Sequence, residues 1–226
     1  MFKGKYGKAL NIALIVSAVV LILGLGFWGY QIYKKYYIDK EAGQAVDDFI
    51  NDKKRPQNTT NSTVTGDVSL NINDLDVSNY TGDNSKLAKK TYKGFTMDGV
   101  LEIPKISLKY PVLDRATDAS MKVAVGINHG VGLNKVGLTV IMGHNSKNGL
   151  FFSNLNKLSE NDIIYIIDND DLRVRYKIYE MFETTSENLD YFSRDTAGKR
   201  EIALSTCLED PTQRLVIIAR EDENQQ

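Results

Sequence analysis

The single cysteine of the chain, Cys207, ends an apolar, strand-like run, and a second apolar run begins at Arg214 after a polar turn that contains Pro211. A thiol attacks as the thiolate, and an ordinary pKa of about 8.5 leaves only a few per cent ionised near neutrality, so a nucleophilic cysteine needs a nearby cation or base. If the two runs pair as antiparallel strands, both side chains emerge at the same end of the sheet. The spacing therefore predicts a nucleophile beside a guanidinium that can hold an oxyanion or a substrate carbonyl.

Two histidines, His129 and His144, could be the base that works with Cys207. His144 has the better context, because it directly follows a predicted buried strand at residues 138–142 and Gly143 permits a sharp exit from that strand. His129 lies in a glycine-rich stretch, residues 126–137, which we expect to be a loop. There an ordinary surface or hydrogen-bonded histidine is the simpler interpretation.

The non-catalytic alternative for Cys207 is a buried cysteine that acts as a small hydrophobic residue. Its context argues against that alternative, because exported proteins commonly pair their cysteines and this chain has only one. Arg220, at the far end of the second apolar run, competes with Arg214 for the role of active cation. The intervening apolar residues place Arg220 at the opposite end of the strand, away from Cys207.

The elements that must position these residues are predominantly strands. Prolines, glycines and polar turns separate apolar or alternating runs at residues 99–104, 106–113, 138–142, 162–168, 172–182, 200–206 and 214–220. Seven or eight short strands with a few short helices predict an all-β domain, a sandwich or a barrel, and closure would hide the sheet edges. We place this domain at residues 92–226.

A membrane segment precedes the domain. Residues 10–33 are apolar almost throughout, and residues 12–30 contain no charge, which is about the length needed to cross a bilayer. Aromatic residues gather at the far end, as in an interfacial belt. A cleaved signal peptide would have a shorter apolar core and a small-residue cleavage site, so we expect an uncleaved anchor. Residues 1–9 would precede the anchor, with lysines on both sides of the span that leave its orientation open. The polar stretch 34–91 would be a partly helical or disordered stalk.

The chain of 226 residues has a net charge of −1, which leaves no basic surplus for phosphates and argues against a nucleic-acid partner. The membrane is the partner that the composition does indicate. No metal or cofactor is expected for chemistry based on a thiol, an imidazole and a guanidinium.

The motif Leu-Ser-Thr-Cys at 204–207, followed by Arg-Leu-Val-Ile at 214–217 and preceded by Gly-His-Asn at 143–145, resembles the sortase family of cysteine transpeptidases. The resemblance covers roughly residues 98–220, and the anchor and stalk are consistent with it. It implies a closed, eight-stranded β-barrel. It also implies an enzyme that joins surface proteins to the Gram-positive cell wall or to one another as pili.

By this resemblance, Cys207 attacks the threonine carbonyl of an LPxTG-like sorting signal, His144 is the general acid and base, and Arg214 stabilises the substrate and the oxyanion. Ser205 lines the substrate groove in some relatives. An amine from a peptidoglycan precursor or from a pilin lysine then resolves the thioester. The implied location is the cell membrane, with one span, the N-terminus inside and the catalytic domain extracellular.

The motifs Leu-Ser-Thr-Cys and Gly-His-Asn-Ser-Lys-Asn-Gly resemble those of class B sortases, but the long helical insertion usual in that class is absent, since only residues 183–199 precede the cysteine strand. This spacing is similar to that of the smaller classes. Two other functions stay open on the residues alone. One is a cell-wall thiol peptidase or hydrolase, and the other is a non-catalytic, membrane-tethered β-domain.

Overall fold

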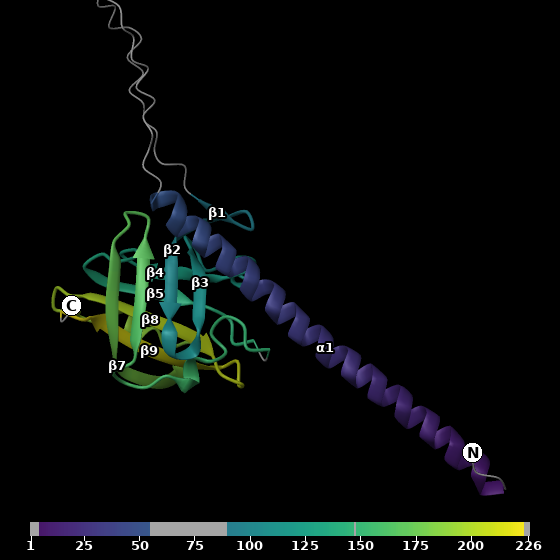
Figure 1. The fold of residues 1–226 in the computed structure, drawn as a ribbon. Coiled ribbons are helices and arrows are strands. Elements are labelled where there is room, and N and C mark those ends of the chain that lie inside the picture. The colour runs from purple at the N-terminus through teal and green to yellow at the C-terminus, as the bar shows by residue number, and fades with distance from the viewer. Residues whose placement is uncertain (1–4, 55–89, 147, 224–226) are drawn as a thin grey trace, which may run out of the picture.

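The computed structural model describes residues 5–54, 90–146 and 148–223. One long helix and nine strands account for most of this part of the chain (Figure 1). The helix is α1 (Lys5–Lys54), and the strands are β1 (Thr91–Tyr92), β2 (Phe95–Ile103), β3 (Leu108–Leu113), β4 (Val125–Gly130), β5 (Gly137–Met142), β6 (Ile163–Asp168), β7 (Arg173–Thr185), β8 (Arg200–Cys207) and β9 (Gln213–Glu221). Short 3-10 turns join several of them, among them η6 (Asp190–Ser193).

Eight strands close into a barrel in the order β2-β3-β4-β5-β8-β9-β7-β6, and β6 pairs back onto β2. The two-residue strand β1 pairs with β2 outside this ring. Two pairs are parallel, β3 with β4 and β5 with β8, and the others are antiparallel. The prediction of an all-β domain with a closed, eight-stranded barrel is confirmed, and closure leaves β2 and β6 without a free edge.

Buried side chains form three clusters that follow the alternation of the strands. The barrel interior holds, among others, Leu101, Ile141, Ile166, Tyr176, Leu204 and Ile217. A second cluster lies outside the barrel between α1 and β2, and it includes Val46, Phe49, Met97 and Val100. A third covers the outer face of β5, β8 and β9, with Leu138, Val140, Met142, Tyr191, Ala203, Val216 and Ile218. The third cluster forms the face on which the candidate site is built.

Strand β4 corrects part of the expectation that residues 126–137 form a glycine-rich loop, because residues 126–130 belong to this strand and only residues 131–136 connect it to β5. Its glycines serve close packing between backbones, because a Cβ on Gly126 would lie 2.8 Å from the carbonyl oxygen of Arg115. At Gly130, where φ is +111°, a Cβ would lie 2.1 Å from the carbonyl oxygen of Leu138. Glycine in a strand interior often marks such an approach, and the low β propensity of glycine hid the strand from the sequence pattern.

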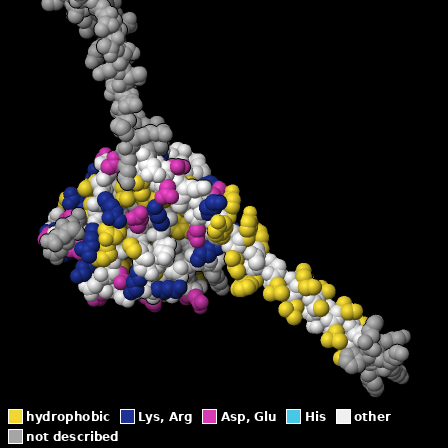
Figure 2. Space-filling view, in the orientation of Figure 1, with side chains coloured by type: hydrophobic (Ala, Val, Ile, Leu, Met, Phe, Trp, Pro, Cys, Tyr) yellow, Lys and Arg dark blue, Asp and Glu magenta, His cyan; other side chains and the backbone are white. Residues whose placement is uncertain are grey.

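Helix α1 is continuous over 50 residues, which corresponds to about 75 Å. Its N-terminal part projects away from the barrel and is covered with apolar side chains, whereas the visible barrel surface mixes charges of both signs (Figure 2). By length and composition α1 could cross a membrane, and its most apolar part is not buried against any described residue. The anchor expected at residues 10–33 lies in this projecting part.

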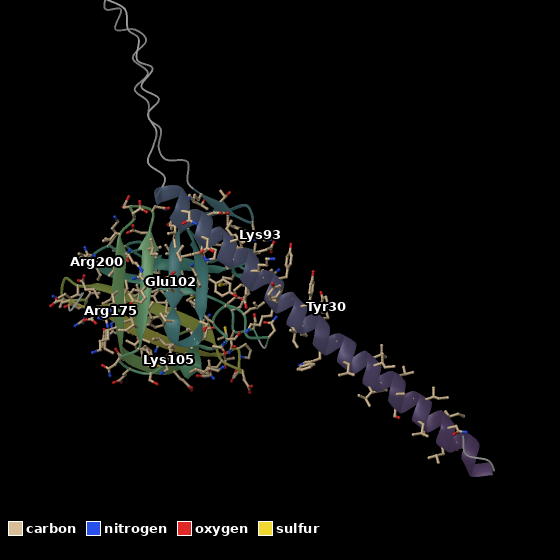
Figure 3. All side chains as sticks on the ribbon, in the orientation of Figure 1. Tyr30, Lys93, Glu102, Lys105, Arg175 and Arg200 are labelled. Atoms are coloured by element: carbon tan, nitrogen blue, oxygen red, sulfur yellow. The ribbon has the colours of Figure 1, made fainter. Side chains whose placement is uncertain are left out.

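The C-terminal part of α1 packs on the barrel, although residues 34–54 were expected to begin a polar stalk. Ala42, Val46 and Phe49 are fully buried, at the spacing of one helix face. Lys93 forms an ion pair with Glu41 at 2.7 Å, and Figure 3 shows Lys93 beside the helix. This stretch therefore belongs to the folded body. The rest of the expected stalk, residues 55–89, lies outside the described residues.

Candidate active site

Cys207 and Arg214 face each other at one end of the β8–β9 pair. They are register partners, and the Arg214 Nη1 atom lies 3.7 Å from the Cys207 Sγ atom. Both residues are half-buried. The Arg214 Nε atom is buried without a hydrogen-bond partner, and none of the described carboxylates forms an ion pair with this guanidinium. The predicted thiol–guanidinium pair is thus present, and the cation keeps its charge uncompensated.

His144 reaches the same end through the parallel pairing of β5 with β8. Met142 is the register partner of Ser205, so two further residues on each strand bring His144 beside Cys207. The chain holds this register beyond the ladder, because the Gly143 N–H donates to the Ser205 carbonyl and the Thr206 hydroxyl donates to the Gly143 carbonyl. In the described chain no hydrogen bond joins the imidazole to the thiol, and such bonds often form only once substrate is bound.

Strand alternation places the side chains of Cys207 and Arg214 on the outer face of the barrel. Met142, Ser205 and Val216 are buried on that face. His144 and Cys207 each follow one of them by two positions, and Arg214 precedes Val216 by two. Because side chains two residues apart in a strand share a face, the thiol and the guanidinium meet outside the barrel, and the β5–β8 register brings the backbone of His144 to the same end.

Asn145 also belongs to the site, and the sequence analysis did not single it out as a separate site residue. Its Nδ2 atom donates a hydrogen bond of 2.9 Å to the carbonyl of Cys207. The carbonyl of His144 accepts a hydrogen bond of 3.0 Å from the N–H of Phe152. The backbones on both sides of the imidazole and the thiol are therefore fixed. The sequence signal for Asn145 was its position directly after Gly143 and His144. Its hydrogen bond to the Cys207 carbonyl could not be predicted, because that bond depends on the pairing of β5 with β8.

Ser205 does not line a groove in this structure. Its side chain is fully buried, and its hydroxyl accepts a hydrogen bond of 3.2 Å from Tyr191, which η6 places over β8. Tyr191 in turn contacts Phe192 edge-on. The hydrogen bond to Ser205 thus links the connection between β7 and β8 to the strand that carries Cys207. Tyr191 and Phe192 lie over β8 here, so a bound substrate would contact these rings rather than the Ser205 hydroxyl.

The two competing residues lie elsewhere. His129 is exposed on β4, where its ring is 5.0 Å from that of Phe192. Arg220 faces Glu201 at the opposite end of the β8–β9 pair, with an Nη2–Oε1 distance of 2.6 Å. The structure therefore brings Cys207 and Arg214 together and places the backbone of His144 at the same strand ends, while His129 and Arg220 lie elsewhere.

A groove of ≈590 Å³ adjoins the site on the side of Thr206. Asn145, Ser153 and Asn154 from the connection between β5 and β6 form one wall, and Leu208 and Glu209 from the turn after Cys207 form the other. Within the described ranges, no three His, Cys, Asp or Glu side chains gather in a group that could hold a metal ion. The chemistry that this site offers is that of a thiol, an imidazole and a guanidinium.

The structure is thus a closed eight-stranded barrel that displays a thiol beside a guanidinium at the end of a strand pair. The sortase domain model matches residues 101–222, which is more than half of the chain. The chain belongs to the sortase family, whose members are in general cysteine transpeptidases.

A relative with a curated description agrees with this assignment. The chain is 32% identical over 123 residues to Sortase A of Bacillus anthracis, and the match spans 53% of this chain and 57% of that protein. The chain thus matches little more than half the length of this relative.

Solved structures show the same fold. The lid mutant of Sortase A from Corynebacterium diphtheriae superposes with a TM-score of 0.53 at 23% identity, covering 58% of this chain and 73% of that one. Sortase C1 of Streptococcus agalactiae in complex with MTSET gives a TM-score of 0.53 at 19% identity, covering 57% and 71%. Both sortase A and sortase C structures are therefore similar to the barrel, which agrees with an unassigned class.

Proposed function

We propose that the protein is a membrane-anchored sortase that cleaves an LPxTG-like sorting signal after threonine and transfers the acyl group to an amine. Cys207 is the nucleophile, His144 the general acid and base, and Arg214 the group that holds the substrate carbonyl. Membership in the sortase family supports the reaction class, and the geometry at the end of β5, β8 and β9 supports the assignment of the residues.

The reaction has two acyl transfers. In the first, the Cys207 Sγ atom bonds to the threonine carbonyl carbon, the following peptide C–N bond breaks, and the imidazolium of His144 gives its proton to the leaving amine. In the second, the acceptor amine attacks the thioester, the C–S bond breaks, and His144 takes the proton from the amine. Because the thiol and the imidazole exchange protons with the same intermediates, the pH profile belongs to the pair.

The observation that carries this proposal is the uncompensated guanidinium beside the thiol. Arg214 lies 3.7 Å from the Cys207 sulfur, and its buried Nε–H has no acceptor. A buried donor without a partner costs free energy, so a folded protein that retains one commonly uses it. The oxygen of a bound carbonyl or of a tetrahedral intermediate would satisfy it.

The proposed placement in the cell follows from the order of the segments. Residues 1–9 lie in the cytoplasm, residues 10–33 cross the membrane once, and the catalytic domain, residues 92–226, is extracellular. Residues 34–91 connect the two. The partners are surface proteins with a C-terminal sorting signal and an acceptor amine, from a peptidoglycan precursor or a pilin lysine.

Mass spectrometry of the full-length protein with a degenerate library of sorting-signal peptides tests the proposal. We expect an acyl adduct on Cys207, and an added oligoglycine or lysine peptide should convert it to an amide product. The Cys207→Ala protein should form neither. A methanethiosulfonate reagent such as MTSET, the compound found with Streptococcus agalactiae sortase C1, should label the native thiol rapidly.

Three results would contradict the proposal. Normal peptide cleavage by Cys207→Ala would exclude this thiol as the nucleophile. Cleavage that ignores the added amine and yields only a free acid would identify a hydrolase. A thiol that reacts with MTSET only after denaturation, together with no cleavage, would indicate a non-catalytic domain.

A further inference from the structure

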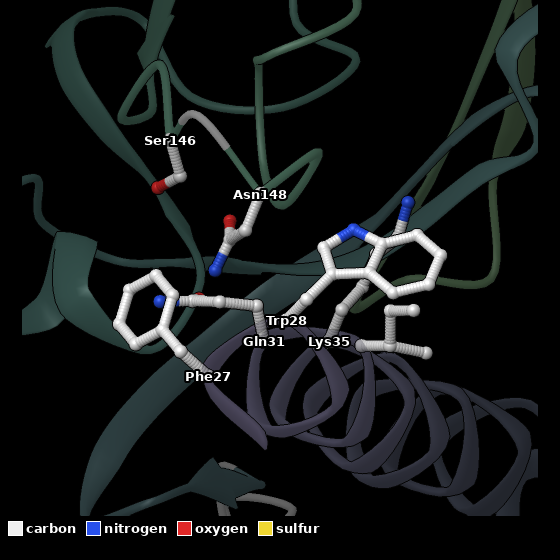
Figure 4. Close-up of a pocket in the computed structure, with 7 residues that line it drawn as sticks. Phe27, Trp28, Gln31, Lys35, Ser146 and Asn148 are labelled. Carbon is white, nitrogen blue, oxygen red and sulfur yellow. The ribbon is translucent and has the colours of Figure 1, made fainter. Parts of the chain in front are cut away.

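A groove of ≈640 Å³ lies between α1 and the segment that follows His144 (Figure 4). Phe27, Trp28 and Ile32 form its apolar wall on the helix. The polar wall consists of Ser146 and Asn148 from the segment after β5, together with Gln31 and Lys35 from the helix. The groove is separate from the reacting groups, yet it touches the segment that carries the imidazole.

The position of the groove along α1 corresponds to the edge of a bilayer. The uncharged stretch 12–30 spans about 28 Å at 1.5 Å per residue, close to the thickness of the hydrocarbon core. The groove begins where that stretch ends, so Trp28 lies at the boundary and Lys35 at the depth of the headgroups. Trp28 is 66% exposed and Phe27 is 65% exposed, as side chains that meet lipid are.

The helix face that packs on the barrel changes from apolar to polar at the groove. From Ile38 to Phe49 this face is apolar and packs on the barrel, but one and two turns earlier it carries Lys35 and Gln31. Lys35 has no ion pair with any carboxylate that the structure describes, and its Nζ lies against Gly149. The Asn148 side-chain oxygen accepts from the Leu150 N–H, and its amide nitrogen is directed toward α1 (Figure 4).

The walls of the groove therefore match the two parts of a phospholipid. An ammonium, an amide N–H and a hydroxyl suit a phosphate, whereas the aromatic and aliphatic side chains one or two turns deeper suit the glycerol and the start of the acyl chains. A soluble anion would use the polar wall only and would leave two largely exposed aromatic rings without a role. The continuity of the groove with the apolar stretch favours lipid.

We propose that this groove binds the headgroup of an anionic glycerophospholipid in the leaflet from which the barrel emerges. The phosphate lies at Lys35, Asn148 and Ser146, and the lipid fixes the segment after His144 at the membrane surface. The site rests on α1 crossing the bilayer, which is part of the proposed function, and it adds a lipid partner to that function.

The full-length protein in nanodiscs offers a direct test, because Trp28 is the only tryptophan of the chain. Brominated phosphatidylglycerol in phosphatidylcholine, and the reverse mixture, quench Trp28 in proportion to the lipid beside it. We expect brominated phosphatidylglycerol to quench about fivefold more effectively at equal mole fraction, as one lysine near a phosphate provides. Lys35→Gln and Asn148→Asp should bring the ratio close to one.

Matched controls separate a site from general surface charge. Lys34 is exposed and does not line the groove, so Lys34→Gln should keep most of the preference. Asn156 is exposed on the same connection and also lies outside the groove, so Asn156→Asp should do the same. Equal losses in the two lysine variants, or in the two asparagine variants, would overturn the site in favour of unspecific attraction.

The other occupants give different results. If millimolar glycerol 1-phosphate abolishes the preference, the groove binds a soluble anion and the proposal is wrong. If neither brominated lipid quenches Trp28 in inserted protein, another protein surface covers the groove and the proposal is again wrong. Failure of the chain to remain with the discs would remove the membrane anchor and the site together, whereas the acyl-transfer assay on peptides would still report on the chemistry.

Discussion

At each end of the β8–β9 pair an arginine of β9 faces a residue of β8. The two arginines differ in whether a carboxylate balances their charge. At one end Arg220 faces Glu201, a carboxylate that is almost fully buried. The Glu201 Oε1 atom accepts hydrogen bonds from Arg220 and from Tyr179, and Arg194 adds a further contact at 3.4 Å. The hydrogen bond to Glu201 raises the pKa of the Arg220 guanidinium above its ordinary value, although partial burial opposes this.

At the other end Arg214 faces Cys207, and no described carboxylate balances its charge. The same strand pair thus holds one arginine whose charge is fully compensated and one whose charge remains available. The first arrangement stabilises the native barrel, because removal of Arg220 leaves the buried Glu201 carboxylate with one cation fewer. The second arrangement attracts whatever negative charge develops at the thiol or at a bound carbonyl. The difference separates an arginine that is paired with a carboxylate from an arginine that faces a thiol.

The largest effect should come from His144, because the proposed mechanism assigns to it the proton transfers that neither arginine can provide. We expect His144→Gln to lower kcat/KM for transfer of a sorting-signal peptide to an amine by about 10²–10⁴-fold. The bell-shaped pH profile should flatten, because glutamine does not titrate. His129→Gln is the matched control and should stay within about twofold, since His129 is exposed on β4 against Phe192. An equal loss in both variants would exclude the assignment of His144.

Arg214→Gln should lower kcat/KM by about 10²–10³-fold, the usual loss when one donor to an oxyanion is removed. Its melting temperature should change little, because Arg214 has no ion pair with a described carboxylate. Arg220→Gln is the matched variant at the other end and should show the reverse, a lower melting temperature and normal activity per folded molecule. Arg214→Lys should fall in between, because lysine keeps the charge and loses the planar fork. Normal turnover by Arg214→Gln would refute the proposed role.

Glu201→Gln should reduce the free energy of unfolding by about 1.5–3 kcal/mol, as expected for buried hydrogen bonds to charged groups. Urea denaturation followed by far-ultraviolet circular dichroism measures this change. Activity per folded molecule should stay within about twofold, because Glu201 lies at the end of β8 opposite Cys207. A large loss of activity in correctly folded Glu201→Gln would show that the two ends are coupled.

The smallest effect should come from Asp210 in the turn between the strands. Its Oδ1 atom accepts hydrogen bonds from the Thr212 hydroxyl and the Thr212 N–H, and these bonds lower the pKa of Asp210 below its ordinary value. The stabilisation is therefore present above about pH 4 and is lost as the pH falls through the folded-state pKa. Asp210→Asn should lower the melting temperature slightly at pH 7, and the difference should become smaller as the pH falls below about 4.

Asp118→Asn serves as the control for Asp210, because Asp118 is an exposed aspartate outside this turn. It should leave the melting temperature unchanged at both pH values. A deficit in Asp210→Asn that persists unchanged at pH 3 would show that the turn does not depend on the ionised carboxylate.

Local patterns sufficed to predict most of the barrel. The alternation at residues 172–182 is one example, since three of the four apolar residues expected on one face, Val174, Tyr176 and Ile178, are buried, whereas Leu172 precedes β7 and is 42% exposed. The facing of Cys207 and Arg214 followed from a tight connection between two apolar runs, for which antiparallel pairing is the simple outcome. Strand β4 was missed because its glycines respond to neighbouring backbones that are distant in sequence.

The features that the sequence did not predict depend on contacts between segments far apart in the chain. The parallel pairing of β5 with β8 joins segments about 60 residues apart, and without it no pattern shows that Asn145 bonds to the Cys207 carbonyl. The contact of Tyr191 with Ser205 could not be predicted either, because the connection between β7 and β8 that carries Tyr191 has no periodic pattern. The docking of α1 was obscured because only one narrow face of residues 34–54 is apolar, within a largely polar stretch.

The two-sided pairing of β8 has a consequence for local motion. Six of its residues pair with β5 and seven with β9, so its amides should exchange with solvent only when the whole barrel opens. The turn that begins at Leu208 has no such ladder and should exchange through brief local openings. Cys207 is the last residue of the paired strand, directly before the turn. The sulfur is therefore held by a strand that is paired on both sides, whereas the chain directly after it lacks such pairing.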